Sequence, residues 1–242
     1  MSIARRRLEA AGLVEGYFRR VNTAEIAHVL RLEWQLDRRQ KHAWGSMALY
    51  VVSTVYTCYL GVNQITSVPV WNALFWIIVL FAAFNALGRS FQREEGGRQL
   101  YLHTLAHPRS VVLARTIYNA GVMVVLSLVS VAAYSLFIGN AVMQEADIGL
   151  FITSLILGGI GLACSLTLIA AIAARAGSGM GLMAILGFPI VLPMLLAMLR
   201  TSKLALDGVA WSVAGKYLIG LVAMDVLAVA LAAILFPYLW RD

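Results

Sequence analysis

Three small groups of ionisable residues have a spacing that could support chemistry. His103 and His107, four residues apart, would share one face of a helix, as two ligands of a metal or of haem iron must. No Cys, Asp or Glu accompanies them, so the pair does not predict a metal site. Glu33 and Asp37 have the same spacing, and Asp225 is the sole acid of a long apolar stretch. An acid within a membrane is costly unless it faces a helix bundle or a wet cavity.

The sequence lacks the short motifs of the common nucleotide-binding and hydrolytic enzymes. It contains no Gly-x-x-x-x-Gly-Lys-Ser/Thr phosphate loop, no Gly-x-Ser-x-Gly elbow, no His-Glu-x-x-His helix and no Cys-x-x-Cys pair. An intramembrane hydrolase would need a serine with a buried histidine or two membrane aspartates, and the sequence predicts neither arrangement. We therefore expect that the chain is not an enzyme by itself and holds no metal or other resident cofactor.

The composition is that of a membrane protein. Apolar residues make up 61% of the chain and charged residues 13%, whereas soluble domains average about 45–50% apolar and about 25% charged residues. The formal net charge of +7 fits this class, because membrane proteins concentrate Lys and Arg in their cytoplasmic loops. The basic excess therefore does not predict a nucleic-acid partner.

Long windows without charged residues set the number of predicted membrane crossings. A crossing helix needs about 20 apolar residues, and a transmembrane β-barrel would show short alternating segments instead. The windows predict an all-α polytopic membrane protein with six transmembrane helices. These helices are residues 46–66, 70–88, 111–139, 148–174, 178–199 and 217–238.

The distribution of Lys and Arg predicts the orientation of the chain. Of its 19 basic residues, 16 fall on the side that holds both termini, and the opposite side keeps only Arg200, Lys203 and Lys216. Because positively charged loops stay inside, both termini are expected in the cytoplasm. Residues 1–23 then form a basic cytoplasmic extension, and residues 24–242 form the membrane domain.

An amphipathic helix is predicted over residues 25–44, on the inner surface of the membrane, because its apolar side chains gather on one arc. Glu33 and Asp37 lie within that arc, where an unpaired carboxylate is costly. We expect basic partners for both acids. The alternative is that both lean toward lipid headgroups and water.

The loop between the second and third crossings, residues 89–109, is the longest polar segment between spans. Its residues 99–106 have helical period and precede Pro108, which predicts a short helix parallel to the membrane. Such a helix can transmit force from a cytoplasmic motor. A solvated connector would have the same pattern, because charged loops need no function.

Irregular and polar residues within the spans have both functional and structural interpretations. Pro189 and Pro193 predict a kink that faces the bundle and lines a pathway, although inert membrane helices also contain proline. Asp225 is either a functional charge or an acid that hydrogen-bonds Ser165 or Thr167 and only fixes packing. Close helix packing is predicted by three glycines of the fourth span, Gly158, Gly159 and Gly161.

Four segments together carry a family resemblance. They are Leu49-Tyr-Val-Val-Ser-Thr-Val-Tyr56, Glu94-Glu-Gly-Gly-Arg-Gln-Leu-Tyr101 with Leu105-Ala-His-Pro108, Phe188-Pro-Ile-Val-Leu-Pro193, and Phe236-Pro-Tyr-Leu-Trp-Arg-Asp242. In these segments the sequence resembles the haem exporter protein B (CcmB) family, the permeases of cytochrome c maturation. The resemblance covers roughly residues 30–242.

This resemblance implies an ABC-transporter permease of the bacterial inner membrane that relies on a separate, CcmA-like subunit to bind and hydrolyse ATP. It places Glu94, Glu95, Gly97, Leu105 and Pro108 in a cytoplasmic coupling helix that contacts that ATPase. It also implies a homodimer within a complex that includes CcmC-like and CcmD-like membrane proteins and a haem chaperone. ATP hydrolysis would drive either haem export or release of the haem-loaded chaperone. A non-transporting scaffold for haem-handling proteins is the alternative function.

Cysteine labelling tests the six-helix topology. In a chain lacking Cys58 and Cys164, Ser67→Cys and Gln144→Cys should react with a membrane-impermeant maleimide in intact cells, because both positions fall in predicted outer loops. Ser90→Cys should react only after lysis. Protection at both outer positions would overturn the topology.

Overall fold

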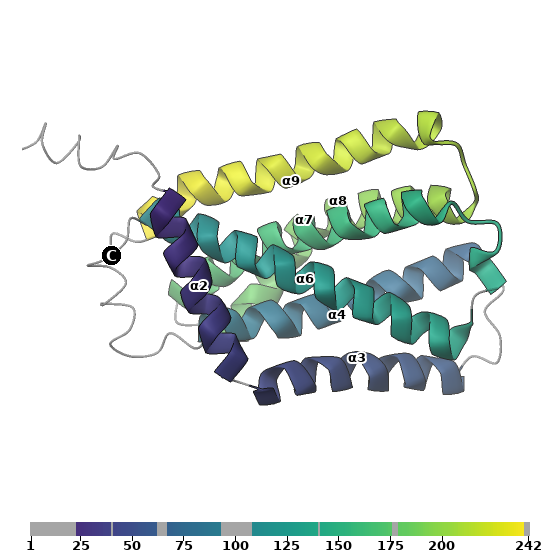
Figure 1. Cartoon of the computed structure of the whole chain (residues 1–242). Coiled ribbons are helices and arrows are strands. Elements are labelled where there is room, and N and C mark those ends of the chain that lie inside the picture. Colours follow the sequence, from purple (N-terminus) through teal and green to yellow (C-terminus); the bar gives the residue numbers. More distant parts are fainter. Residues whose placement is uncertain are drawn as a thin grey trace, which may run out of the picture.

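The computed structural model describes residues 23–39, 41–61, 67–92, 108–139, 141–175 and 179–239. Long helices lie side by side along one axis, and a shorter helix crosses one end of this bundle (Figure 1). The described residues contain seven α-helices, one 3-10 turn and no strand, which confirms the all-α prediction. In chain order the elements are α2 (Thr23–Arg39), α3 (Lys41–Gly61), α4 (Val68–Gln92), α6 (Pro108–Ile138), η1 (Ala141–Met143), α7 (Ile148–Arg175), α8 (Gly179–Leu206) and α9 (Trp211–Leu239).

Five of the described helices are long and apolar enough to cross a membrane, which indicates a multi-pass membrane protein. Their spans are Val68–Gly88, Ser110–Ile138, Ile148–Ala173, Gly181–Leu206 and Trp211–Ala232. The sequence predicted six crossings. The predicted crossing that is not among these five, residues 46–66, corresponds to α3. This helix has 21 residues and lies beside α4 and α6, but it is less apolar than the other five (Figure 1).

Hydroxyl groups account for part of the lower apolarity of α3. Ser53 Oγ and Thr54 Oγ1 donate to the carbonyl oxygen of Tyr50 at 3.0 and 2.8 Å. Thr57 Oγ1 donates to the carbonyl oxygen of Ser53 at 2.8 Å. Because these hydroxyls are satisfied within their own helix, α3 presents less polarity to its surroundings than its composition indicates.

Several helix ends lie beyond the predicted spans. α6 begins at Pro108, α8 continues to Leu206 and α9 begins at Trp211, whereas the sequence predicted bounds at 111, 199 and 217. The prediction ended the fifth span before Arg200 and began the sixth span after Lys216, because these residues are charged. A helix that leaves the hydrocarbon layer needs no further apolar side chains, so the backbone continues through these residues.

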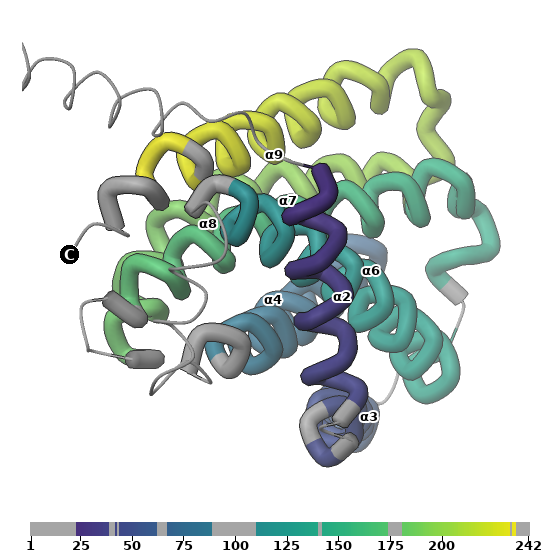
Figure 2. The backbone as a smooth tube through the Cα atoms, turned by 60° about the vertical axis from the view of Figure 1, so that its left-hand side comes forward, coloured from purple at the N-terminus to yellow at the C-terminus, as the bar shows by residue number. Residues whose placement is uncertain are grey.

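α7 is the central helix and packs against α4, α6, α8 and α9 (Figure 2). Its glycines give these helices room to approach, as the sequence predicted. A Cβ atom at Gly158 would lie 2.5 Å from the ring of Trp76 on α4, and one at Gly159 would lie 3.2 Å from Ser127 Oγ on α6. The third glycine, Gly161, faces α8 and α9. Larger side chains at these positions would therefore push the bundle apart.

A buried polar network joins α4 to α8. Trp76 Nε1 donates to Ser202 Oγ at 2.8 Å, and Ser202 Oγ donates to Asn72 Oδ1, also at 2.8 Å. Asn72 Nδ2 completes the network by donating to the carbonyl oxygen of Leu199 at 2.8 Å. These bonds fix the ring of Trp76 against Gly158, because the indole N–H cannot turn away without losing its acceptor.

We expect Gly158→Ala to destabilise the protein by about 1–3 kcal/mol, since the fixed Trp76 ring cannot yield to the added methyl group without strain. Thermal unfolding in detergent should then show a Tm lowered by about 2–4 °C for each kcal/mol. Gly121→Ala on α6 is the matched control, because a Cβ there meets no atom within 4 Å. Equal Tm values for the two variants would contradict the close packing at Gly158.

Candidate functional site

α2 crosses the end of the bundle and packs against the start of α6 (Figures 1 and 2). Val29 of α2 is buried with Val111 and Ala114 of α6. Ile26 and Leu30 flank this contact. The apolar arc that the sequence predicted is therefore partly covered by α6. The helix ends at Arg39, before the predicted bound at 44, and α3 begins at Lys41.

Both acids of the apolar arc bind side chains of α6. Glu33 Oε1 lies 3.3 Å from Arg115 Nε, with side chains only 16% and 6% exposed. Asp37 Oδ2 accepts a hydrogen bond of 2.6 Å from the hydroxyl of Tyr118. The expected basic partner is confirmed for Glu33, and Asp37 bonds a phenol. We call these four residues the α2–α6 clamp.

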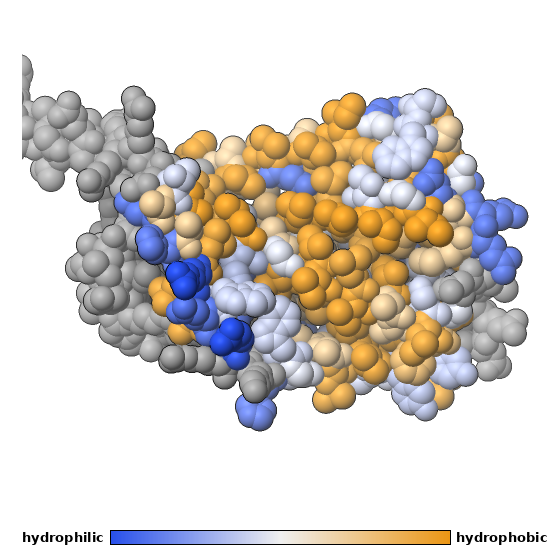
Figure 3. Space-filling model, in the orientation of Figure 1, coloured by the Kyte–Doolittle hydropathy of each residue, from blue (hydrophilic) through white to orange (hydrophobic). Residues whose placement is uncertain are grey.

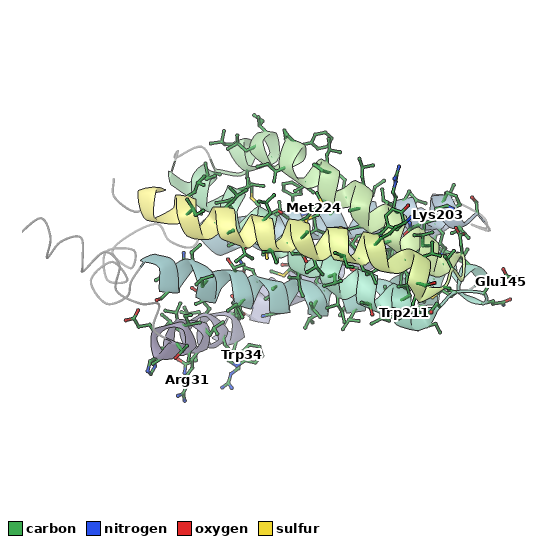
Figure 4. The ribbon with its side chains drawn as sticks, turned by 90° about the horizontal axis from the view of Figure 1, so that it is seen from above. Arg31, Trp34, Glu145, Lys203, Trp211 and Met224 are labelled. Carbon is green, nitrogen blue, oxygen red and sulfur yellow. The ribbon has the colours of Figure 1, made fainter. Side chains whose placement is uncertain are left out.

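The outward face of α2 is left basic by this arrangement. Its exposed residues include Arg31, Trp34 and Arg38, and Figure 4 shows Arg31 and Trp34 pointing away from the bundle. In Figure 3 the hydrophilic surface of α2 borders the wide hydrophobic surface of the bundle. A cationic helix with an exposed tryptophan beside an apolar band is typical of a membrane interface.

Asp225 is buried among α7, α8 and α9. Its Oδ1 atom and Met194 of α8 occupy the space in front of Gly161. Oδ1 has no hydrogen-bond partner within the described part of the chain, so the predicted bond to Ser165 or Thr167 is absent from that atom. Ser165 Oγ lies against Met194 Sδ at 3.6 Å. Thr167 Oγ1 accepts a hydrogen bond of 2.9 Å from Asn119 of α6.

Pro189 and Pro193 do not face the packed interior of this chain, whereas the sequence predicted a kink that faces the bundle. Both are exposed, and α8 runs unbroken through them. Each lies two residues from buried Val191, which is about 200° around a helix. The buried side of α8 recurs every three or four residues, at Met183, Gly187, Val191, Met194 and Met198. The two prolines therefore lie on the exposed side of α8, and their part in a pathway stays a prediction.

Asp147 connects α7, α8 and α9 at the end of the bundle opposite α2. Its Oδ1 accepts from the backbone N–H of Leu150 at 2.9 Å, which caps the N-terminus of α7. Its Oδ2 accepts from Trp211 Nε1 at 2.7 Å, and its own N–H donates to the carbonyl oxygen of Ala205 at 2.9 Å. This junction was not predicted from the sequence. An aspartate directly before an apolar run was the available signal, because this is a preferred N-cap.

The predicted coupling residues Glu94, Glu95, Gly97 and Leu105 lie outside the described residues, as do His103 and His107. Pro108 is the first residue of α6, a position that proline favours because its missing N–H is not needed there. Among the described residues, no group of three or more His, Cys, Asp or Glu side chains could hold a metal ion.

One comparison with known proteins identifies the family. The model of the family described as CcmB protein matches residues 24–239. No curated protein and no solved structure gives a match. Since the match covers most of the chain, the chain belongs to the CcmB family. Its members are permease-type subunits of an ABC transporter in cytochrome c maturation and have an ATPase partner.

A double-mutant cycle tests the α2–α6 clamp. Glu33→Gln and Arg115→Gln should each lower the free energy of unfolding by about 3–5 kcal/mol, because each removes one partner of a buried ion pair. The double variant should cost less than the sum of the two. Lys203→Gln, which breaks the exposed pair with Asp207 at 2.7 Å, is the control and should cost about 0–1 kcal/mol. Additive effects at Glu33 and Arg115 in equilibrium unfolding would argue against the clamp.

Proposed function

We propose that this chain is the transmembrane subunit that couples ATP hydrolysis by a CcmA-like partner to haem handling in cytochrome c maturation. The observation that carries the proposal is the family match over residues 24–239, on a chain with five long apolar helices among its described residues. The sequence contains no phosphate loop, so the partner must bind the nucleotide.

The α2–α6 clamp supports a specific route for the coupling. The polar loop that holds Glu94 and Glu95 leads directly into α6 at Pro108. Arg115 and Tyr118 lie within the first three turns of α6, and both bind α2. A displacement of this loop by the ATPase would therefore move α6 and α2 together, because the buried ion pair resists separation. In this proposal Glu94, Glu95, Gly97, Leu105 and Pro108 form the contact with the ATPase.

The proposal includes six crossings, with α3 as the sixth, and both termini in the cytoplasm of a bacterial inner membrane. The exposed cationic face of α2 then lies at the inner surface, as the positive-inside rule requires. Glu145, Lys203 and Trp211 lie together at the opposite end of the bundle (Figure 4), which is the outer end in this orientation.

The cargo in this proposal is the haem-loaded chaperone, which ATP hydrolysis releases, and haem export is the second candidate. The five described spans contain no histidine, and Asp225 is their only acid. They therefore offer none of the histidine ligands that haem iron most often takes from proteins. This favours a mechanical role in which CcmC-like and CcmD-like partners handle the haem. A second copy of the chain would cover part of the exposed apolar faces of α8 and α9.

A scaffold without transport activity is the competing function. A motor-coupled permease changes the ATPase rate of its partner, because nucleotide hydrolysis and helix movement are linked steps. A scaffold only holds its partners together and leaves that rate unchanged. The ATPase rate of the reconstituted complex therefore separates the two functions.

Charge reversal by Glu94→Lys with Glu95→Lys should abolish stimulation of the partner ATPase and lower c-type cytochrome levels about tenfold or more, because attraction at the contact becomes repulsion. The readouts are the ATPase rate of the purified complex and haem-stained cytochromes in cells. Glu145→Lys is the matched control, since this exposed acid lies at the opposite end of the bundle (Figure 4). Normal stimulation by the double variant would make the loop a simple connector.

A further inference from the structure

Asp225 is a buried acid within the described spans to which the proposed function gives no role. It lies on the contact face of α9, which also includes buried Leu221 and Ala232, and it is 7% exposed. Gly161 of α7 leaves the space that Asp225 Oδ1 and Met194 fill. The carboxyl group thus occupies the contact among three helices, and Oδ1 has no hydrogen-bond partner among the described residues.

The helices packed directly around Asp225 offer no charge to balance a carboxylate. Residues 148–174 of α7 and 179–199 of α8 contain no Asp, Glu, Lys, Arg or His. The titratable side chain of α7 nearest to Gly161 is Cys164, one helical turn further along and only 2% exposed. Residues 179–199 of α8 contain neither Tyr nor Cys.

α6, the other described helix packed against α9, supplies no counter-charge either. Residues 116–138 of α6 contain no charged residue. Their titratable groups are Tyr118, which donates to Asp37, and Tyr134, which donates to the carbonyl oxygen of Trp71 at 3.1 Å. On α9 itself the nearest charge is Lys216, nine residues before Asp225, which is more than two turns away.

An unpaired carboxylate in such surroundings is far costlier than the neutral acid. We propose that Asp225 is a proton-binding site, which holds its proton while α9 is packed on α7 and α8. When α9 separates and water enters, the O–H bond of the carboxyl group breaks, the proton passes to water as hydronium and the carboxylate remains. The packed form binds one proton more than the separated form, so a rise in pH favours separation.

The test uses Cys164 as a reporter of the separation of α9, in a Cys58→Ser chain within the full complex and without nucleotide. Because Cys164 is only 2% exposed, N-ethylmaleimide should alkylate it only when the contact opens. The alkylation rate of Cys164 is divided by the alkylation rate measured in Asp225→Asn at the same pH. This ratio removes the pH dependence that comes from ionisation of the thiol itself. We expect this ratio to rise with pH, by up to about tenfold per pH unit. A carboxylate beside a packed Cys164 would instead disfavour the thiolate and lower the ratio.

Infrared titration provides a second, direct readout. The carbonyl stretch of a protonated carboxyl group should be present at neutral pH in the wild-type chain and in Ser165→Ala, a neighbour without a titratable group. It should be missing in Asp225→Asn and shifted in Asp225→Glu, which keeps the acid if the asparagine variant does not assemble. An alkylation ratio that is constant or falls with pH, or a spectrum unchanged by both Asp225 variants, overturns the proposal. Neither measurement uses ATP or haem, so the result is independent of the proposed function.

Discussion

The close approach of four helices to α7 is the constraint on which the rest of the bundle depends. Without side chains at Gly158, Gly159 and Gly161, α7 can take a ring of α4, a hydroxyl of α6 and side chains of α8 and α9 against its backbone. Lipid tails are as apolar as leucine, so helices in a membrane gain little from apolar burial alone. Close van der Waals contact replaces that driving force, and it exists here only because the three glycines add no bulk.

The two ends of the bundle are held by polar contacts. At one end Glu33 and Asp37 attach α2 to α6, and at the other Asp147 joins the start of α7 to α8 and α9. Each contact is directional, because charged and phenolic hydrogen bonds weaken steeply with distance and angle. α6, which the clamp holds at its start and which packs on α7, is therefore expected to move together with α2.

These restraints shape how the proposed coupling would work. The segment that would meet the ATPase enters α6 at Pro108, and the clamp passes any movement of α6 to α2 at the membrane surface. Of the five described spans, that of α9 is the least buried, so in this proposal α9 is the helix that separates. Asp225 lies at the contact that such a separation would break. In this proposal, a movement that the ATPase drives at one end of the bundle would also open the proton-binding contact of Asp225 at its centre.

The sequence by itself determined the helical class, the approximate spans and the role of the glycines, because charge, apolar length and residue size act locally along the chain. It also predicted that Glu33 needs a basic partner, but Arg115 is 82 residues away, and only packing selects it. Tertiary structure alone decided that Pro189 faces away from the bundle, since helix rotation depends on which neighbours cover α8. It likewise decided that Asp225 Oδ1 faces Gly161 and forms no hydrogen bond with Ser165. The sequence shows which groups are costly to bury, and the arrangement of neighbouring helices decides what each of them meets.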